Sequence, residues 1–510
     1  MNLTELLKEN EQARCRYWDH RDYFLNLRLQ WRAQMARHMF HLLPGESILD
    51  LGCGMGQWTR ALSAVNQHRN PICAATFDPD CHQALRQQNL PENIEPVLVE
   101  SLSETLKDRQ FDYVVGWHML PSENYGQYLL AVKQLLKPGG QFLLFEPNPW
   151  NPYYVLRKFL ARLFLFFRKT QRRPTFNRIE MMSILSEIGF TGIKILPYDF
   201  LFPPIPKFML WPVQNLSLVL ENMPYVRNFA GELYLWGQNP PPAGWEKPKA
   251  NLACHAGLKG RVSVVVPCHN EEANIAPLVN SLRGYYDDYL HEIVLVDDNS
   301  RDRTAEVAEQ LGREDSRIKL VKRSMPNGVG RALRDGLAAA QGDYILLMDC
   351  DFQHILPELT GLFEAADLGA DVAIGSRFSR DSVLLNYPFT KILANRAFHI
   401  LARILFRKEL RDLTNNLKLM KQEVARRIHL ESDDFAANAE TGLQPLLMGY
   451  DVVEVPISWV NRSVDMGFSS FNLAKTGPNY FKVFFRLFTR RLFGKDITVP
   501  APKQPKPDTP

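Results

Sequence analysis

The sequence predicts two doubly wound α/β domains joined by a linker. Both halves alternate short apolar stretches with stretches of helical periodicity, which is typical of parallel sheets covered by helices on both faces. A segment rich in Pro, Gly and Lys interrupts this pattern once, over residues 239–260. We therefore expect a first domain over 1–238, a linker over 239–260, a second domain over 261–495 and a disordered tail over 496–510.

Composition narrows the class of protein. The chain has 510 residues with a formal net charge of +4, which is too small to indicate a nucleic-acid partner. Its seven cysteines form no C-x-x-C pair or zinc spacing, and the first twenty residues carry acids and amides where a secretory signal would be apolar. We also find no apolar run of about 18 residues. These features predict a reducing, cytoplasmic environment, no export and no spanning helix.

The first domain begins with a strand, a glycine-rich turn and a helix, over 46–62. Gly52, Gly54 and Gly56 let the backbone turn tightly and approach a ligand without a Cβ in the way. One strand-helix unit later the stretch ICAATFDPD ends in Asp78, where an acid would accept hydrogen bonds from ribose hydroxyls. This spacing favours a nucleotide-like cofactor, although tight strand-helix turns also need glycine for purely structural reasons.

Further along, FDYVVGWHML (111–120) predicts a strand, LLKPGG (135–140) a helix end with a turn, and QFLLFEPNPW another strand. Together with Asp50-x-Gly52-x-Gly54-x-Gly56 and Asp78, these segments resemble the class I S-adenosylmethionine-dependent methyltransferases across about residues 30–240. The resemblance implies that Asp50 and the glycine loop hold the methionine moiety of S-adenosylmethionine, and that Asp78 binds its ribose. The acid that related enzymes often carry near the adenine is missing, and Glu100 is the candidate substitute.

The methyl acceptor is not readable from these residues. Methyl transfer from a sulfonium depends mainly on alignment and a desolvated acceptor, so it needs no dedicated base. His118, at a predicted strand end, is a candidate acceptor-side base, and a purely structural histidine is the favoured alternative. A first domain that serves only as a binding or scaffolding module also stays open.

Acidic residues follow three predicted strands of the second domain. VSVVVPCHN (262–270) leads into a helix, EIVLVDD (292–298) ends in two aspartates, and LLMDCDFQH (346–354) places Asp349 and Asp351 on one face of an extended strand. Ligands bind where such parallel strands end, and paired carboxylates there suit a hard divalent cation that bridges to a diphosphate.

These segments, with NGVGRALRDGL, IGSRF, DLTNNLKLMKQEV and EVPISWVNR, resemble the inverting glycosyltransferases of the GT-A fold, particularly the dolichyl- or polyprenyl-phosphate mannose synthases, over about 261–475. The resemblance implies a nucleotide-sugar donor (GDP-mannose or a UDP-sugar), a divalent metal (Mg or Mn) and a polyprenyl phosphate acceptor. It also implies that Pro267, Asn270 and Glu272 line the nucleotide pocket, with Asp298 on its base or ribose side. Asp349 and Asp351 would hold the metal, and Gln353 would approach the metal diphosphate. Arg377 and Arg462 would neutralise phosphates.

The acceptor side departs from that family. QHILPE carries an extra residue where relatives have histidine-proline-proline, and NNL (415–417) replaces the usual glycine-phenylalanine. A lipid phosphate is already ionised near neutral pH, so it needs no strong base. A glycan or lipid hydroxyl acceptor, the alternative, would need a positioned carboxylate.

Three segments, 153–169, 389–408 and 479–495, interleave aromatic and leucine residues with Arg and Lys. They predict basic amphipathic helices that lie on an anionic membrane surface, at the inner face of the membrane. Core-packing helices whose long basic side chains lie along the protein surface are the alternative. The oligomeric state is not predicted.

Overall fold

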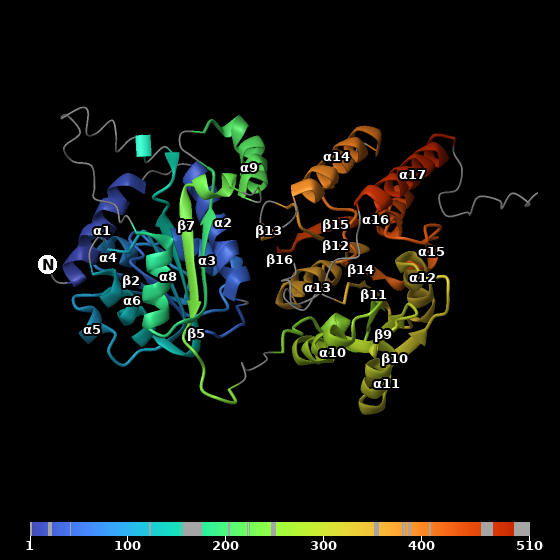
Figure 1. The fold of residues 1–510 in the computed structure, drawn as a ribbon, viewed down its shortest axis with the longest axis horizontal. Helices are drawn as coiled ribbons and strands as arrows, with labels where there is room; N and C mark the ends of the chain where they lie inside the picture. The colour runs from blue at the N-terminus through green and yellow to red at the C-terminus, as the bar shows by residue number, and fades with distance from the viewer. Residues whose placement is uncertain are drawn as a thin grey trace, which may run out of the picture. The chain divides into compact units, whose positions relative to one another are not determined.

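The computed structural model describes two compact units, Met1–Pro248 and Lys249–Pro510. Each is an α/β fold on its own sheet, so the predicted fold class is confirmed (Figure 1). The described residues are 3–18, 23–40, 42–121, 124–152, 155–156, 176–201, 205–221, 223, 225–245, 251–350, 356–379, 382, 384–385, 389–406, 410–460 and 473–493. The predicted tail 496–510 and nearly all of segment 153–169 lie outside them.

The division between the units falls inside the segment 239–260 that we expected to be a linker. Its second part packs on the second unit, because Leu252 and Leu258 are buried there and the Leu252 N–H donates to the Tyr285 carbonyl at 2.7 Å. Residues 251–260 therefore contribute to the second unit.

The sheet of the first unit has the order β3-β2-β1-β4-β5-β7-β6. The pairs from β3 to β5 are parallel, and β7 runs antiparallel to both of its neighbours. The carboxyl ends of β1, β2, β4 and β5 thus share one edge with the start of β7. The strands are β1 (Ile48–Leu51), β2 (Ile72–Thr76), β3 (Ile94–Leu98), β4 (Phe111–Trp117), β5 (Leu136–Pro147), β6 (Thr191–Tyr198) and β7 (Glu232–Gln238).

Helices cover both faces of this sheet (Figure 1). The inner strands are buried on both faces, as their near-continuous apolar sequences require. The helices are α1 (Leu3–Trp18), α2 (Tyr23–Phe40), α3 (Gln57–Val65), α4 (Pro79–Arg86), α5 (Leu102–Thr105), α6 (Tyr125–Gln134), α8 (Arg178–Glu187) and α9 (Lys207–Glu221).

One predicted element differs. The stretch LKPGG, expected to be a helix end with a turn, belongs to β5, which already begins at Leu136. Leu136 pairs with Phe111, and the register between β4 and β5 shifts between Phe111 and Tyr113. This irregularity accommodates Gly139 at a φ of 82°, so the residues expected to form a turn are part of an irregular strand instead.

The sheet of the second unit has the order β10-β9-β8-β11-β14-β12-β15. Only β14 runs antiparallel to its neighbours, β11 and β12, among the described pairs. The start of β14 therefore meets the carboxyl ends of β8, β9, β11 and β12 at one edge. The strands are β8 (Val262–Cys268), β9 (Leu290–Asp297), β10 (Ile318–Lys322), β11 (Tyr344–Leu347), β12 (Val372–Ser376), β14 (Lys418–Lys421) and β15 (Val452–Pro456), with β13 (Leu384–Leu385) and β16 (Trp459–Val460) in a separate pair.

Two long helices of this unit, α14 and α17, lie side by side (Figure 1). Their contact is aromatic: the Phe484 ring lies 5.4 Å from the Phe398 ring and 4.9 Å from the Phe406 ring, centroid to centroid. The helices of the unit are α10 (Glu272–Tyr286), α11 (Thr304–Glu314), α12 (Val329–Ala339), α13 (Thr360–Asp367), α14 (Phe389–Phe406), α15 (Gln422–Arg427), α16 (Ala437–Met448) and α17 (Leu473–Leu492).

The amphipathic segments 389–408 and 479–495 contain all of α14 and much of α17. Both helices contribute to the buried core of the unit, through Phe398, Phe406, Phe484 and Leu487. The core-packing alternative is thus correct for one face of each helix. None of the described helices is both long enough and apolar enough to cross a membrane.

Candidate functional site

The glycine loop of the first unit follows β1 and leads into α3. Gly52, Gly54 and Gly56 have φ angles of 78°, 57° and 68°, which L side chains rarely adopt. A Cβ on Gly52 would lie 2.4 Å from the Met119 sulfur, and one on Gly56 would lie 2.5 Å from a Leu85 methyl. Conformation and packing therefore both require glycine here, so the motif alone does not identify a ligand.

The two predicted acids of the cofactor site lie at the same edge of the sheet. Asp50 is buried, accepts a hydrogen bond from the Thr59 hydroxyl at 2.6 Å, and burial raises its pKa to about 6. Asp78 is also buried and caps α4 by accepting from the Asp80 N–H at 3.2 Å. Glu100, the candidate substitute near the adenine, is exposed two residues after β3.

The cavity beside these acids does not fit S-adenosylmethionine as it stands. It measures about 30 Å³, room for a few water molecules, whereas pockets for drug-sized ligands occupy roughly 300–1,000 Å³. Its lining includes Asp50, Trp58 and Trp117, and also Arg14 and Cys15 of α1. The indole N–H of Trp58 is buried without a hydrogen-bond partner in the described part of the chain. The chemistry of the site suits a nucleoside, but α1 fills its volume.

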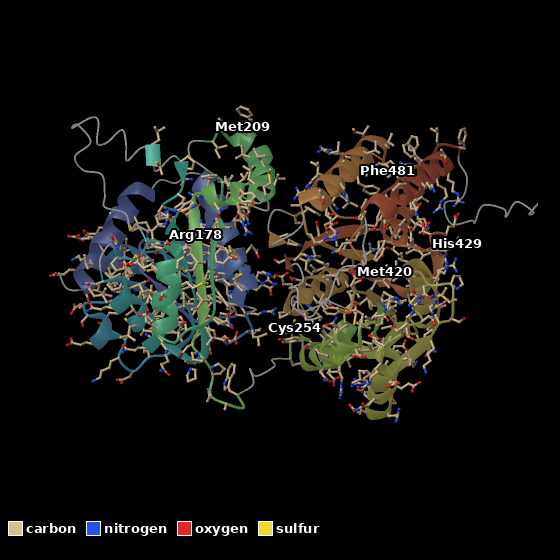
Figure 2. All side chains as sticks on the ribbon, viewed as in Figure 1. Arg178, Met209, Cys254, Met420, His429 and Phe481 are labelled. Carbon is tan, nitrogen blue, oxygen red and sulfur yellow. The ribbon has the colours of Figure 1, made fainter. Side chains whose placement is uncertain are left out.

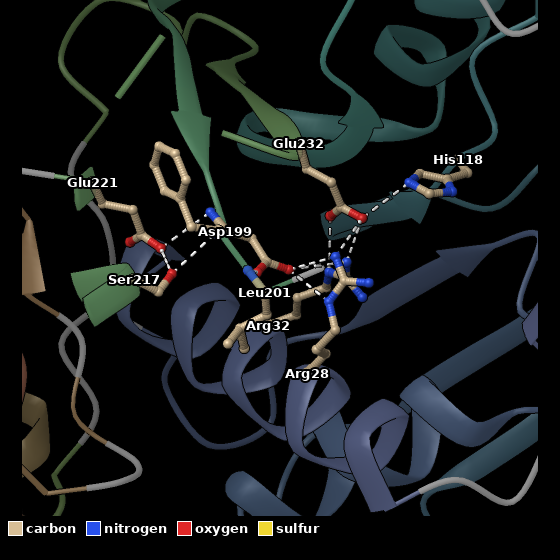
Figure 3. A network of polar contacts seen from close by, with 9 residues as sticks. Arg28, Arg32, His118, Asp199, Leu201, Ser217, Glu221 and Glu232 are labelled. Carbon is tan, nitrogen blue, oxygen red and sulfur yellow. Dashed lines mark hydrogen bonds and ion pairs between the residues drawn. The ribbon is translucent and has the colours of Figure 1, made fainter. Parts of the chain in front are cut away.

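A buried charge network lies at the same edge of this sheet (Figure 3). Arg28 of α2 donates to Asp199, after β6, at 2.7 Å, and Arg28 and Arg32 both donate to Glu232 at the start of β7. Burial raises the pKa of Glu232, but the Arg32 and Arg28 charges outweigh burial and hold it below the ordinary value. Two cations and two carboxylates thus compensate each other inside the protein.

His118 belongs to this network. Its Nε2 lies 3.1 Å from a Glu232 oxygen, and its backbone N–H donates to the Phe145 carbonyl at 2.8 Å. The residue before it, Trp117, is covered by the Arg32 guanidinium at 4.5 Å and the Arg14 guanidinium at 5.5 Å from the ring centroid. The geometry favours the structural reading of this histidine over a free acceptor-side base.

In the second unit, the first predicted nucleotide residues join two loops at the carboxyl ends of β8 and β9. The Asn270 N–H donates to Ser300 at 3.0 Å, and the Asn270 side-chain oxygen accepts from the Arg301 N–H at 2.8 Å. Glu272, at the start of α10, accepts from the Arg303 N–H at 2.8 Å. Asn270 and Glu272 are exposed and Pro267 is half-buried, so all three border solvent at this edge.

Asp298 and Asp349 lie at that same edge, just after β9 and β11, the strands that flank β8. Because β8 lies between them, β9 and β11 are two strand spacings apart, about 10 Å. A diphosphate with its bound cation covers that distance. Asp298 is buried and accepts from the Arg323 guanidinium and from the Gly328 N–H, the latter at 2.7 Å. It therefore holds the loop that opens α12 against the end of β9.

Asp349 is half-buried and accepts from the Asn416 side-chain amide at 2.8 Å. The carbonyl oxygen of that amide is buried without a hydrogen-bond partner in the described structure. A carboxylate beside an unsatisfied amide oxygen is the donor set that Mg²⁺ and Mn²⁺ prefer, so these residues fit a hard cation. No group of three or more His, Cys, Asp or Glu side chains able to hold a metal occurs among the described residues.

Arg377 follows β12 and is bound by Asp412, which is completely buried. Its side chain donates to both Asp412 oxygens, at 2.7 and 2.9 Å, and its backbone N–H donates as well, at 2.9 Å. Burial raises the pKa of Asp412, yet the charge and hydrogen bonds of Arg377, together with His399, hold it below the ordinary value. In this conformation Asp412, and not a phosphate, balances the Arg377 charge.

Lys418, the first residue of β14, is also completely buried, and burial lowers its pKa to about 7. It donates to the carbonyls of Asn415 and Asn438, the latter at 3.1 Å. The predicted site residues Asp351, Gln353 and Arg462 lie outside the described residues, so their placement stays a prediction.

Sequence reasoning missed several residues at the two sites. Glu11 and Arg14 of α1 bind the glycine loop, although polar residues on a terminal helix indicate a solvated face. Asn416 enters the sequence analysis only as part of the NNL departure from the family pattern, and Lys418 only as part of the segment DLTNNLKLMKQEV. A lysine between Leu417 and Leu419 was the one available signal, because a charge inside an apolar strand indicates a specific partner.

Comparison with known proteins finds one family in each half of the chain. A model described as glycosyl transferase family 2 matches residues 263–428, and one described as a methyltransferase domain matches residues 17–195. A dolichol-phosphate mannosyltransferase of Pyrococcus furiosus is 31% identical over 207 residues, which are 40% of this chain. A polyprenol monophosphomannose synthase of Mycolicibacterium smegmatis is 30% identical over 230 residues, which are 44% of this chain and 85% of that protein.

The chain spans 57% of the length of the Pyrococcus relative. Among solved structures, a glucosyl-3-phosphoglycerate synthase from Mycobacterium tuberculosis is 19% identical, with a TM-score of 0.37, over 49% of this chain and 86% of that one. A score of that size supports no conclusion about this chain. The sequence relatives match the C-terminal half. The chain therefore belongs to glycosyl transferase family 2 through its C-terminal half, and its N-terminal half is a methyltransferase domain.

Proposed function

We propose that the C-terminal half transfers a sugar from a nucleotide diphosphate sugar, GDP-mannose or a UDP-sugar, to a polyprenyl phosphate in the presence of Mg or Mn. The observation that carries this proposal is the common sheet edge of Asp298, Asp349 and Asn416, at the ends of β9 and β11 and before β14. The names of the two sequence relatives, which are mannosyl transferases to dolichol or polyprenol phosphate, support the acceptor class.

The residues at this edge orient two anions toward each other. A bound divalent cation would neutralise the diphosphate that leaves with the nucleoside. Asn416 fixes the orientation of Asp349, and Asp298 holds the loop at the start of α12. The acceptor phosphate is itself an ionised nucleophile, so this chemistry requires positioning and no strong base. Arg377 acts here as a positioning residue, because Asp412 anchors it to the segment that leads into β14.

The same half docks on an anionic membrane surface, where a polyprenyl acceptor resides. We define the docking face as Leu393, Ile400 and Ile404 of α14 with Phe481, Phe485, Leu492 and Phe493 at α17 (Phe481 in Figure 2); their exposed fractions run from 42% to 72%. The exposed residues recur at i, i+7 and i+11 on α14 and at i, i+4 and i+11 on α17, so each helix presents one apolar stripe. Exposed Arg403, Lys482 and Arg491 supply positive charge beside it.

A donor and acceptor screen tests the sugar transfer. Purified protein is incubated with GDP-mannose or UDP-sugars, polyprenyl phosphate and Mg²⁺ or Mn²⁺, and the lipid product is identified by mass spectrometry. A polyprenyl-phosphate sugar supports the proposal. A product formed on a glycan or lipid hydroxyl, without need of polyprenyl phosphate, supports the alternative acceptor class.

For the N-terminal half we propose S-adenosylmethionine-dependent methylation of an unidentified acceptor. Asp50, Asp78 and the glycine loop at one sheet edge support this, together with the match to a methyltransferase domain. The second candidate is a binding or scaffolding module. The observation that favours it is that α1 fills the space that the cofactor needs. A heat of S-adenosylhomocysteine binding in calorimetry supports the methyltransferase over the scaffold.

A further inference from the structure

Helix α1 places a carboxylate on the backbone donors of the cofactor site. Glu11 is completely buried, and its two oxygens accept from the Gly54 N–H at 2.7 Å and the Phe77 N–H at 2.6 Å. Gly54 belongs to the glycine loop after β1, and Phe77 directly precedes Asp78 after β2. These two amides lie where a nucleoside cofactor would have to approach the backbone.

Arg14, one turn further along α1, binds the carbonyls of the same region. It is 93% buried, donates to the Trp117 carbonyl at 2.7 Å and also to the Gly52 carbonyl. Its guanidinium lies 4.0 Å from the Glu11 carboxylate, so the two charges partly compensate each other inside the protein. Both charged side chains point into the site, and neither lies on a solvated face of the helix.

The glycine loop itself is packed against α1. A Cβ on Gly54 would lie 2.7 Å from the Cys15 sulfur and 2.8 Å from an Arg14 nitrogen. The space that this glycine opens is therefore filled by the chain's own helix, and about 30 Å³ remains beside it. A ligand of nucleoside size and α1 cannot share this volume.

We propose that α1 is a self-docked plug of the methyl-donor site, which has to leave before S-adenosylmethionine binds. Glu11 occupies donors that the ligand needs, and Arg14 secures the helix to Gly52 and Trp117. The apparent affinity for the cofactor is then the intrinsic affinity multiplied by the fraction of molecules with α1 undocked. This inference rests on the proposed methyltransferase function, and it adds a self-inhibiting contact to it.

Two native cysteines allow the plug to be trapped in its docked position. The Cys15 sulfur on α1 lies 3.8 Å from the Cys81 sulfur on α4. Diamide oxidises such a pair: both thiols lose a proton and an electron, one S–S bond forms, and the azo group of the reagent is reduced to a hydrazine. Dithiothreitol reverses the reaction. The resulting disulfide would hold α1 over the glycine loop.

The experiment measures binding of S-adenosylhomocysteine by calorimetry in the full chain with the exposed Cys254 replaced by serine. We expect at least tenfold tighter binding by Glu11→Ala and by Arg14→Ala than by the parent. Diamide should abolish binding in the parent, dithiothreitol should restore it, and Cys15→Ser should be insensitive to diamide. Peptide mass spectrometry confirms the Cys15–Cys81 bond, and circular dichroism confirms that each variant is folded.

Amide hydrogen exchange provides a readout that needs no cofactor. In Glu11→Ala the peptides that contain Gly54 and Phe77 should exchange at least tenfold faster, because their N–H groups lose the buried acceptor. The proposal is wrong if the disulfide-bonded and the reduced protein bind S-adenosylhomocysteine equally well. It is also wrong if Glu11→Ala and Arg14→Ala both bind more weakly than the parent, because α1 would then form part of the wall of the site. If no form of the protein binds the probe, the proposed methyl-donor function fails, and the plug fails with it.

Discussion

The docking face leads to a quantitative prediction about membrane binding. In the double variant Ile404→Glu, Phe485→Glu, two apolar side chains that are 65% and 51% exposed are replaced by acids. Full burial of such side chains contributes ~1.5–3 kcal/mol each, so their exposed fractions correspond to ~1.7–3.5 kcal/mol together. We therefore expect partitioning onto vesicles to fall about 20- to 350-fold, before any repulsion by an anionic leaflet is added.

Cosedimentation with vesicles of phosphatidylglycerol and phosphatidylcholine measures this partitioning. Leu368→Glu is the matched control, because Leu368 is 82% exposed at the end of α13, outside the docking face. The control should bind like the parent, and binding of the parent should weaken at high salt. If the double variant binds within threefold of the parent, or if the control loses as much, these helices do not dock on the membrane.

Three further outcomes follow from the charges of the two sites. Removal of divalent metal with EDTA should abolish sugar transfer, and added Mg²⁺ or Mn²⁺ should restore it; activity that persists in EDTA contradicts the cation site. Asp412→Asn should lower the free energy of unfolding by ~3–5 kcal/mol in urea titrations, because Arg377 keeps a charge without a counter-ion; a loss below 1 kcal/mol contradicts the pairing. Glu146 of β5 is completely buried and accepts from the Met119 and Leu120 N–H groups at 3.0 and 2.8 Å. Burial raises its pKa from 4.5 to about 8, so the folded state retains a proton that the unfolded state has released. Stability therefore falls as pH rises through this window, by at most ~1.4 kcal/mol per pH unit. Glu146→Gln should therefore gain stability relative to the parent between pH 5 and pH 8, and a constant difference between the two proteins would show that Glu146 does not titrate in this way.

The periodicity of the chain predicted both sheets because buried parallel strands are short, apolar and followed by helices. The acidic ends of β9 and β11 were predictable for the same reason, since parallel strands bring their carboxyl ends to one edge. Asp298 and Asp349 lie at that edge, as expected from the pattern alone.

Contacts between distant segments could not be predicted from periodicity. Glu11 reaches Gly54 and Phe77 across 43 and 66 residues of sequence, and nothing near Glu11 indicates such partners. The pairing of Arg377 with Asp412 was hidden in the same way, because the sequence does not show which anion an arginine meets. The amphipathic pattern of α14 and α17 likewise does not reveal that each helix has two apolar faces, one for the core and one exposed.

The central claim, that the acidic strand ends carry sugar transfer, is tested most directly by Asp349→Asn. Asp343→Asn is its control, because Asp343 precedes the same strand β11 at the opposite edge of the sheet and is exposed. The measurement is the initial rate of sugar transfer to polyprenyl phosphate at saturating metal, with melting temperatures to confirm folding. We predict a loss of at least 100-fold for Asp349→Asn and less than threefold for Asp343→Asn. An Asp349→Asn protein that transfers sugar at the parent rate would contradict the account.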